Sequence, residues 1–512
     1  MLSKEWAKLQ NESDIRGIAI GGIEGEIVNL TDSVIYSITS SFIVWLSQVK
    51  QISARELRIS IGTDSRLSGP KVKNSAINAI VNAGCHVYDC KMASTPAMFM
   101  STVTKGYEYD GAIMVTASHL PFNRNGLKFF TNRGGLEKKD ITRILEISEA
   151  NEFPTSKKLG QISSVDFISV YADILVKKIR DEVNHTEHRL EPLKGFKVVV
   201  DAGNGAGGFF VNKVLIPLGA DVDGSQFIEP DGNFPNHIPN PEDKIAIESI
   251  SKAVLQNKAD IGIIFDADVD RAGAVGGSGR EINRNRLIAL MAAIVIEEHP
   301  NSIIVTDSVT STGLKNFIEG KLGGVHCRFK RGYKNVINKG IEFNNEGNEC
   351  HLMIETSGHG ALRENYFLDD GAYLVTKILI KMAKLKQKGN KTIESLIVEL
   401  DEPAESREFR MNIKAENFKQ YGSDIISDLQ KYAVNEPKWH VAPDNHEGLR
   451  VSFDKNNGDG WLLLRMSLHD PLMPLNIESD SEGGVKIIVS KLLEFLCRYT
   501  KLDIKSLQEF AL

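Results

Sequence analysis

The chain has 512 residues and a formal net charge of -6, with 42% hydrophobic and 25% charged residues. It is too long for one hydrophobic core, so three or four domains are expected, and the composition is that of an ordinary soluble globular protein. The negative charge argues against a large nucleic-acid surface, which needs a positive field.

The five cysteines are odd in number and form no C-x-x-C pair, so the sequence suggests neither a disulfide framework nor a zinc site and favours a reducing compartment. Lys4, Glu5 and Lys8 are followed by no apolar segment, so no secretory signal is predicted. The longest apolar run, residues 287–296, is too short to span a membrane and indicates a buried helix. We expect a cytoplasmic protein that binds no membrane, or a plastid one if a transit peptide is missing from the sequence.

Strands and helices alternate along the chain. A β-branched run at 57–61 ends at Gly62-Thr63-Asp64, and apolar residues then recur at helical spacing from Val72 to Val81. Gly84 is placed to end this helix, and residues 85–88 begin another strand. This order is typical of a βαβ unit and predicts a largely parallel sheet.

The same order recurs further on, with a predicted helix from Val165 to Ile179. Each later strand ends in acids, hydroxyls or glycine; these strands are residues 196–200, 260–265, 302–305 and 351–354.

The last segment, from residue 401 on, has a different pattern of predicted elements. Strand-like runs at 449–453 and 461–466 are separated by a polar turn and follow a helical region, which predicts a helix with an antiparallel sheet. We therefore expect an α/β protein with three mixed α/β domains in series and a smaller C-terminal α+β domain. The boundaries predicted are 1–160, 161–282, 283–400 and 401–512.

The first chemical motif is Thr116-Ala117-Ser118-His119-Leu120-Pro121, which follows the apolar run 112–115. A buried strand there would deliver a hydroxyl and an imidazole to the edge where open α/β sheets bind ligands. Taken alone, a Ser-His pair more often belongs to an ordinary turn than to a catalytic site. Adjacent residues rarely face each other and no G-x-S-x-G elbow is present, so Ser118 needs an activating group from elsewhere.

Three carboxylates follow a predicted strand at Asp266, Asp268 and Asp270. They can converge on one cation only if the backbone loops around it, and oxygen ligands alone favour Mg²⁺. An EF-hand is excluded because Arg271 occupies its glycine position. The alternative is a solvated acidic turn.

Two further clusters carry polar groups. Glu355 and Ser357 follow a predicted strand and suit two vicinal sugar hydroxyls, although Ser357 could instead be a helix N-cap. Arg465 and Ser467 follow another strand and could hold a dianion through charge-assisted bonds. The alternative is an ordinary surface arginine.

Together, and in this order, the four clusters resemble the α-D-phosphohexomutase family, which includes phosphoglucomutases, phosphomannomutases and phosphoglucosamine mutases. The matching motifs are a Thr-Ala-Ser-His-x-Pro loop, an Asp-x-Asp-x-Asp-Arg loop, a Glu-x-Ser-Gly-His loop and an Arg-x-Ser loop. Smaller matches at residues 13–17, 62–68 and 125–128 extend the resemblance over nearly the whole chain.

The resemblance implies a heart-shaped protein of four domains around a central cleft. It implies transfer of a phosphoryl group between O1 and O6 of a hexose through a bisphosphorylated sugar, with Ser118 phosphorylated in the resting enzyme. A hexose bisphosphate would serve as activator.

The resemblance also implies residue roles. One Mg²⁺ would be held by phosphorylated Ser118 and by the three aspartates, Arg16 and Arg271 would offset negative charge, and Lys128 and His119 are candidates for the general acid and base. The implied sugar-phosphate ligands are Glu355, Ser357, His359, Lys330, Tyr333, Lys334, Arg465, Ser467 and His469.

Two departures from the family pattern affect the substrate site. Leu468, His469 and Asp470 stand where the phosphate loop usually has a small residue, a threonine and then Glu or Gln, and Tyr333 stands where a histidine is usual. Phosphate capture and sugar preference could both differ as a result.

The first hypothesis is therefore a mutase of the glucose or mannose type, acting on sugar phosphates as a monomer or homodimer. The alternatives are a regulatory homologue that binds sugar phosphates with weakened catalysis, a phosphoglucosamine mutase, and a metal-dependent phosphatase.

Overall fold

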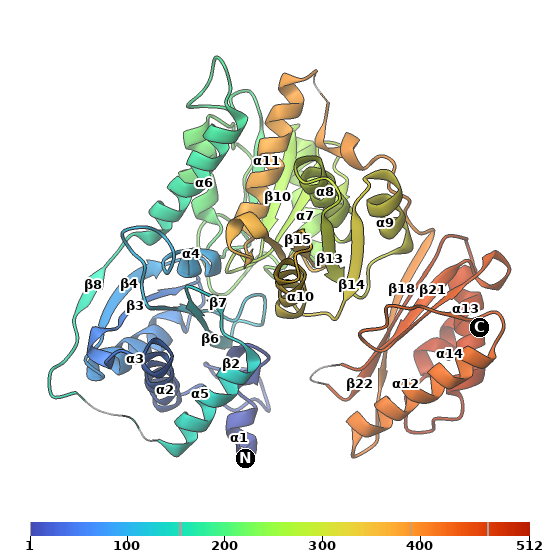
Figure 1. Ribbon diagram of the computed structural model, residues 1–512, viewed down its shortest axis with the longest axis horizontal. Helices are drawn as coiled ribbons and strands as arrows, with labels where there is room; N and C mark the ends of the chain where they lie inside the picture. Colours follow the sequence, from blue (N-terminus) through green and yellow to red (C-terminus); the bar gives the residue numbers. More distant parts are fainter. Residues whose placement is uncertain (1, 152, 154–155, 390, 468–469) are drawn as a thin grey trace. The chain divides into compact units, whose positions relative to one another are not determined.

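The computed structural model describes residues 2–151, 153, 156–389, 391–467 and 470–512 (Figure 1). It divides into two compact units, Met1–Ile294 with Ser357–Leu396 and Val295–Thr356 with Ile397–Leu512. Within the described residues, no helix is both long and apolar enough to cross a bilayer.

The first sheet belongs to the first unit and has parallel strands at its centre. Its order is β1 (Gln10–Asn11), β2 (Asp14–Ile18), β6 (Arg124–Thr131), β5 (Gly111–Val115), β3 (Arg58–Thr63), β4 (His86–Met92) and β8 (Ile162–Ser164), with β7 (Gly134–Gly135) paired to β6. Strands β5, β3, β4 and β8 are parallel, as the βαβ pattern predicts. Strands β1, β2 and β6 are antiparallel additions, which the largely parallel prediction did not include.

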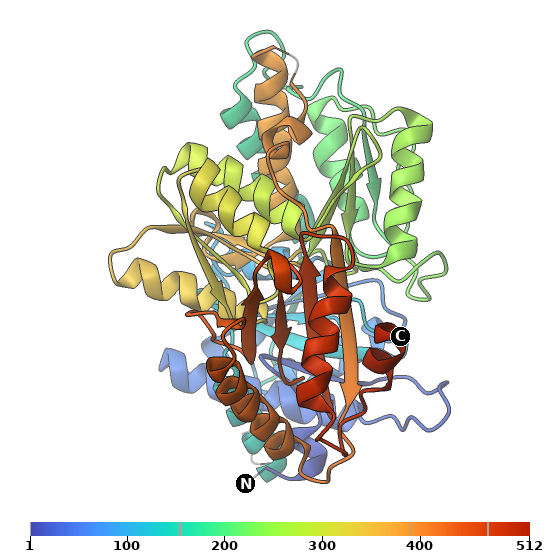
Figure 2. The same ribbon diagram turned by 90° about the vertical axis from the view of Figure 1, so that its right-hand side faces the viewer.

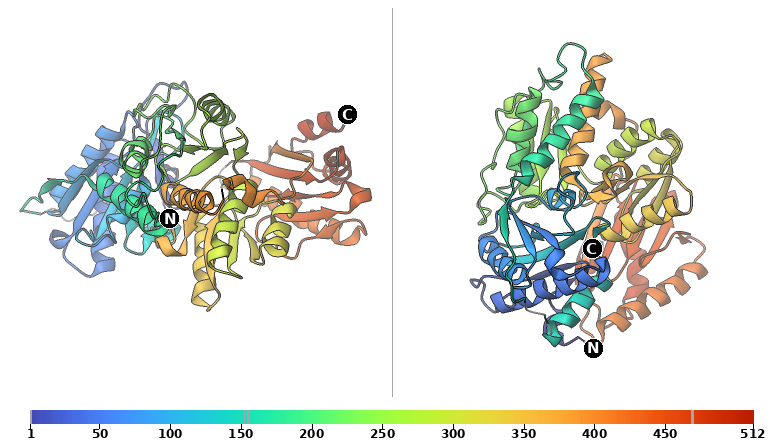
Figure 3. Two further views of the ribbon diagram at one scale, coloured as in Figure 1. Left: turned by 90° about the horizontal axis from the view of Figure 1, so that it is seen from above. Right: turned by 60° about the vertical axis from the view of Figure 1, so that its left-hand side comes forward.

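The helices beside this sheet are α1 (Lys4–Ala7), α2 (Asp32–Lys50), α3 (Gly69–Asn82), α4 (Thr95–Met100) and α5 (Lys138–Ala150). The longer ones, α2, α3 and α5, bury apolar residues that repeat at helical spacing, whereas the short α1 buries none of its residues. Ile35, Ile38 and Phe42 of α2 are buried in one core with strand residues Ile59 and Ile113. Figure 3 shows α2 and α3 against the first sheet.

The second sheet also lies in the first unit, in the order β12 (Glu281–Ile282), β11 (Ala272–Gly276), β10 (Ile261–Phe265) and β9 (Val198–Asp201). Strands β9 and β10 are parallel, whereas β10 and β11 form an antiparallel pair with Phe265 opposite Ala272. Residues 266–271 are therefore the loop of a tight hairpin. The unit also contains α6 (Phe167–Val183), α7 (Lys244–Asn257), α11 (Gly371–Gln387) and the antiparallel pair β16 (Gly360–Leu362) and β17 (Leu368–Asp369).

The second unit contains a parallel group and an antiparallel sheet. Strand β13 (Ile303–Asp307) lies between β14 (Val325–Phe329) and β15 (Cys350–Ile354), with α9 (Thr312–Asn316) and α10 (Tyr333–Asn345) in the same stretch of chain. The antiparallel sheet has the order β18 (Glu405–Asn412), β22 (Leu472–Ser479), β21 (Gly460–Leu464), β20 (Leu449–Phe453) and β19 (His440–Val441).

Helices α12 (Phe418–Asn435), α13 (Gly484–Leu496) and α14 (Lys505–Ala511) share a core with this sheet, and Figure 2 shows α13 lying across it. The predicted helix with an antiparallel sheet is confirmed. The apolar run at 287–296 lies in α8 (Asn285–Glu298), and its residues are buried, as predicted. The remaining short helical segments are Ala54–Glu56, Phe210–Leu215, Ile216–Leu218, Phe317–Lys321, Arg363–Asn365, Ile393–Ile397 and Lys455–Asn457.

Candidate active site

Ser118 lies in a sharp loop after the fully buried strand β5. Its φ of 50° is a left-handed conformation that side chains other than glycine seldom adopt. The Ser118 N–H donates to Thr116 Oγ1 at 2.9 Å, and the Thr116 hydroxyl donates to Asp64 Oδ2 at 2.7 Å. A chain of hydrogen bonds therefore fixes the turn that presents the serine.

Arg66 holds the same loop from its buried side, a role that no motif predicted beyond the match at residues 62–68. Its guanidinium donates to the carbonyl oxygens of Pro121 at 2.8 Å, Arg124 at 3.0 Å and Leu120 at 2.6 Å, and also to that of Ser118. Arg66 is only 1% exposed and pairs with Asp64, Nε to Oδ2 at 3.5 Å. Burial raises the pKa of Asp64 to about 6, although Arg66 opposes this.

The acidic hairpin loop between β10 and β11 brings its three carboxylates together. Asp266, Asp268 and Asp270 are buried, and each offers an oxygen within 4.8 Å of the others. Val269, a β-branched residue, has a φ of 67°, so the backbone does loop as convergence requires. The alternative of a solvated acidic turn is wrong, because the neighbouring elements exclude solvent from all three side chains.

The donor set of this loop fits a hard divalent cation. Lys128 Nζ donates to Asp268 Oδ2 at 3.0 Å and also to Asp270 Oδ2. Among the described residues, the other oxygens of these two carboxylates, Asp268 Oδ1 and Asp270 Oδ1, are buried without a hydrogen-bond partner. Burial and the two neighbouring carboxylates raise the pKa of Asp266 well above its ordinary value, so the cluster is short of positive charge. Carboxylate oxygens are the ligands that Mg²⁺ takes.

The serine loop and the acidic loop meet, although they are far apart in sequence. The Ser118 hydroxyl donates to Asp266 Oδ2 at 2.7 Å, and His119 Nδ1 lies 3.3 Å from Ser118 Oγ. Arg271 and burial lower the pKa of His119 to about 2, so its imidazole is neutral. The structure thus supplies the neighbours that Ser118 lacks in its own sequence surroundings.

Arg16, predicted to offset negative charge, lies at the same place. It donates to Asp14 Oδ2 at 2.9 Å. Burial favours its neutral form, but Asp14, Asp268 and Asp270 outweigh burial and raise the pKa of Arg16. Its cationic side chain therefore faces the acidic loop, as expected for a residue that balances charge.

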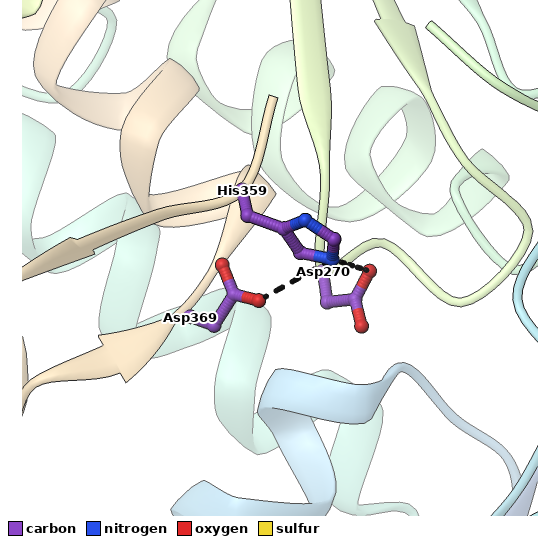
Figure 4. Close-up of side chains that lie close together, drawn as sticks. All are labelled: Asp270, His359 and Asp369. Carbon is purple, nitrogen blue, oxygen red and sulfur yellow. Dashed lines mark ion pairs between the residues drawn. The ribbon is translucent and has the colours of Figure 1, made fainter. Parts of the chain in front are cut away.

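His359, the residue just before β16, lies beside the acidic loop (Figure 4). Its Nε2 lies 3.6 Å from Asp270 Oδ1 and 3.6 Å from Asp369 Oδ2, a grouping that could itself be read as a metal site. Arg271 Nε donates to His359 Nε2 at 3.0 Å, and His359 Nδ1 lies 2.9 Å from Ser357 Oγ. Since both ring nitrogens are engaged, the acidic loop fits a cation better than this group does.

Ser357 is not a helix N-cap, because it lies between strands β15 and β16 and contacts His359. That alternative is wrong. No sequence pattern predicted Asp369 as a site residue. The one feature that could have indicated it is its position as an acid at the end of the short strand β17.

In the second unit, the predicted sugar loop surrounds the start of α10. The Gly332 N–H donates to Glu355 Oε1 at 2.7 Å, and Arg331 Nε lies 3.5 Å from Asp307 Oδ2. Tyr333 and Lys334 are the first two residues of α10. Burial and Glu355 raise the pKa of Asp307 to about 7, although Arg331 opposes them.

Lys330 lies just before this helix and is exposed, with its Nζ 5.9 Å from the centre of the Phe329 ring. It is therefore available to a ligand.

Arg465 directly follows β21 and is 8% exposed, so the alternative of a surface arginine is wrong. Its Nη1 lies 3.7 Å from Glu447 Oε1, and burial lowers its pKa. Ser467 Oγ accepts from the Asp470 N–H at 3.2 Å. Leu468 and His469 lie outside the described residues.

The predicted residues thus fall into two groups, one in each unit. The first unit brings together Ser118, His119, Lys128, Arg16, Arg271, Asp266, Asp268, Asp270, Ser357 and His359. The second unit holds Glu355, Lys330, Tyr333, Lys334, Arg465 and Ser467.

Comparison with known proteins matches the chain to one family over most of its length. The models of phosphoglucomutase/phosphomannomutase alpha/beta/alpha domains I, II and III match residues 7–155, 173–279 and 283–400.

Individual relatives extend over nearly the whole chain. The phosphomannomutase/phosphoglucomutase of Pseudomonas syringae pv. tomato is 30% identical over 442 residues, covering 86% of this chain and 87% of the relative. The phosphoglucomutase of Neisseria gonorrhoeae is 28% identical over 477 residues, covering 92% and 94%. The crystal structure of a phosphoglucomutase/phosphomannomutase family protein from Burkholderia thailandensis has 25% identity and a TM-score of 0.77, covering 97% of this chain and 98% of its own.

Proposed function

The chain belongs to the phosphoglucomutase/phosphomannomutase family and is a phosphohexomutase, and we propose that Ser118 carries the phosphoryl group that it transfers. The enzyme is an intramolecular phosphotransferase that interconverts hexose 1-phosphate and hexose 6-phosphate. One observation carries the assignment of Ser118: its hydroxyl lies 2.7 Å from Asp266 Oδ2, in a buried cluster of three carboxylates.

We propose that Asp266, Asp268 and Asp270, together with phosphorylated Ser118, hold one Mg²⁺. When bound, the ion supplies the positive charge that phosphoryl transfer requires. The protein itself adds the cations Arg16 and Arg271, which face the same loop and offset charge on the transferring group.

Lys128 and His119 are the proposed proton donor and acceptor for the sugar hydroxyl. Both lie within reach of the reacting centre, since Lys128 contacts two of the carboxylates and His119 lies beside Ser118 Oγ. General acid–base catalysis requires this proximity first.

The proposed substrate ligands follow from the resemblance to the family. Glu355 and Ser357 bind two vicinal sugar hydroxyls, His359 is a further substrate ligand beside Ser357, and Arg465 and Ser467, with His469, bind the phosphate that is not reacting. The remaining proposed ligands are Lys330, just before α10, and Tyr333 and Lys334, its first two residues. A fixed anchor for the phosphate that is not reacting suits a substrate that binds in two orientations. A hexose bisphosphate links the two orientations and also serves as the activator.

The names of the relatives favour glucose and mannose phosphates over glucosamine phosphate as substrates. They give no support to the regulatory or phosphatase alternatives. We further propose a cytoplasmic location, which the five free cysteines and the bacterial relatives support, and a monomer or homodimer. The division at 160, 282 and 400 into four domains is part of the same proposal.

Two measurements test this function. Mass spectrometry of the purified protein should find one phosphoryl group on Ser118. A coupled assay with glucose, mannose and glucosamine 1-phosphates, each with a hexose bisphosphate, should find turnover with the first two. Sugar-phosphate binding with no turnover on any substrate would overturn the proposal and select the regulatory alternative.

A further inference from the structure

A carboxylate of the chain itself occupies an anion-binding arrangement in the second unit. Glu447 Oε2 accepts hydrogen bonds from the Ser308 hydroxyl at 2.7 Å and from the Arg331 backbone N–H at 3.0 Å. Its other oxygen, Oε1, lies 3.7 Å from Arg465 Nη1. Three donors from separate segments of the chain therefore converge on one side chain.

These donors are those that bind phosphate in proteins. A hydroxyl, a backbone N–H at the approach to a helix and an arginine together recognise phosphate through directed, charge-assisted bonds. The site is enclosed, because the side chains of Arg465 and Glu447 are only 10% and 14% exposed. A phosphate and the Glu447 carboxylate cannot share the same donors, because like charges at contact distance repel strongly.

We propose that Glu447 is an internal competitor of the substrate: its carboxylate occupies the donors of Ser308, Arg331 and Arg465, and it must leave when the non-reacting phosphate binds. This inference rests on the proposed role of Arg465 as the phosphate anchor. It adds Ser308 as a phosphate ligand, a residue that no sequence motif indicated.

The surroundings of Glu447 favour release by rotation of its side chain alone. Gly448 has a φ of 65°, and a Cβ there would lie 2.2 Å from the Leu464 carbonyl oxygen and 2.8 Å from Arg465 Cα. Asn445 fixes the same loop, since its side chain accepts from the Arg450 N–H at 2.6 Å and donates to the Ala442 carbonyl at 2.6 Å. The backbone is thus held against Arg465, and only the side chain of Glu447 is left to move.

The competition has a direct consequence for affinity. A site whose donors are occupied by Glu447 about nine-tenths of the time binds phosphate about tenfold more weakly than the open site. Removing the charge of Glu447 should therefore tighten binding rather than weaken it. A residue that merely braces Arg465 would have the opposite effect.

Calorimetric titration of the full-length protein with inorganic phosphate and with glucose 1-phosphate tests the proposal. Glu447→Gln should lower both dissociation constants by about tenfold, with a lower KM. Glu447→Asp, which retracts the carboxylate by one methylene, should move both in the same direction and serves if the first variant is unstable. Ser308→Ala should weaken binding, and Glu416→Gln, an exposed acid of the same unit, is the control for net charge.

Unchanged or weaker phosphate binding by folded Glu447→Gln and Glu447→Asp would overturn the competition. The role of Arg465 is tested separately by Arg465→Ala. Loss of phosphate binding in that variant, with no tightening in the Glu447 variants, would leave the anchor standing and remove only the competitor. Binding of phosphate by Arg465→Ala at the strength of the unsubstituted protein would overturn both.

Discussion

Arg66→Lys tests whether the serine loop depends on the guanidinium behind it. Arg66 serves four backbone carbonyl oxygens of residues 118–124 from two nitrogens. A lysine ammonium has three donors on one nitrogen, whereas a guanidinium has five in a planar fork. The substitution keeps the positive charge beside Asp64 but loses one or two of the four bonds.

The magnitude follows from those lost bonds. Hydrogen bonds to a charged group contribute roughly 1.5–3 kcal/mol each, so the loss of one or two of them should cost the loop about 1.5–6 kcal/mol of stability. A displacement of a catalytic group by about 1 Å costs roughly a hundredfold in rate. We therefore expect kcat to fall about a hundredfold with KM changed less than about threefold, because Arg66 holds Ser118 and not the sugar.

The assay is coupled mutase kinetics together with thermal unfolding. Arg143→Lys is the matched control, because Arg143 lies on α5 with its side chain 58% exposed and pairs only with its helix neighbour Glu146 among the described residues. A kcat for Arg66→Lys within threefold of the unsubstituted protein, despite a lower melting temperature, would refute the reasoning.

Three further substitutions have defined outcomes. Ser118→Ala should abolish transfer and remove the phosphoryl group seen by mass spectrometry, with the melting temperature nearly unchanged; residual turnover would contradict the role of Ser118. Asp268→Asn should raise the Mg²⁺ concentration needed for half-maximal activity by about tenfold or more, because the loop loses one of its three charges; an unchanged Mg²⁺ requirement would exclude Asp268 as a ligand. Glu478→Gln should become more stable relative to the unsubstituted protein as the pH rises from about 4.5 to 7. Burial raises the pKa of Glu478 from 4.5 to about 7. The protonated side chain therefore contributes its full stability to the unsubstituted protein below a pH of about 4.5, and this contribution is lost above a pH of about 7. The gain is at most about 3 kcal/mol, and a stability difference independent of pH in thermal unfolding would contradict it.

Local patterns in the sequence predicted the residues of the serine and acidic loops but not what surrounds them. The three aspartates at alternate positions could be recognised because they all lie in one hairpin loop. The contact between Ser118 and Asp266 spans 148 residues, and only the resemblance to a family linked the two. Glu447 and Ser308 are 139 residues apart and gave no signal at all, since neither lies in a recognisable motif.

Two of the three alternatives, the solvated turn and the surface arginine, failed because the side chains are buried, and the helix cap failed because no helix begins at Ser357. A solvated turn, a helix cap and a surface arginine are reasonable readings of Asp268, Ser357 and Arg465 when each is judged by its neighbours in sequence. All three side chains are less than 9% exposed because other elements cover the strand ends on which they lie. The antiparallel strands β2 and β6 escaped prediction for a related reason: an apolar run indicates a strand but not its direction.

The acidic loop is held in a strained conformation by the protein itself. The left-handed φ of Val269 costs on the order of 1–3 kcal/mol, and such strain persists only where neighbours determine it. The Asp268 carbonyl accepts from the Thr95 N–H at 2.8 Å, where α4 begins, and the Val269 carbonyl accepts from the Gly371 N–H at 3.1 Å, where α11 begins. Two helix N-termini thus fix the backbone on which the carboxylates stand, and these contacts are the neighbours that keep the strained loop in place.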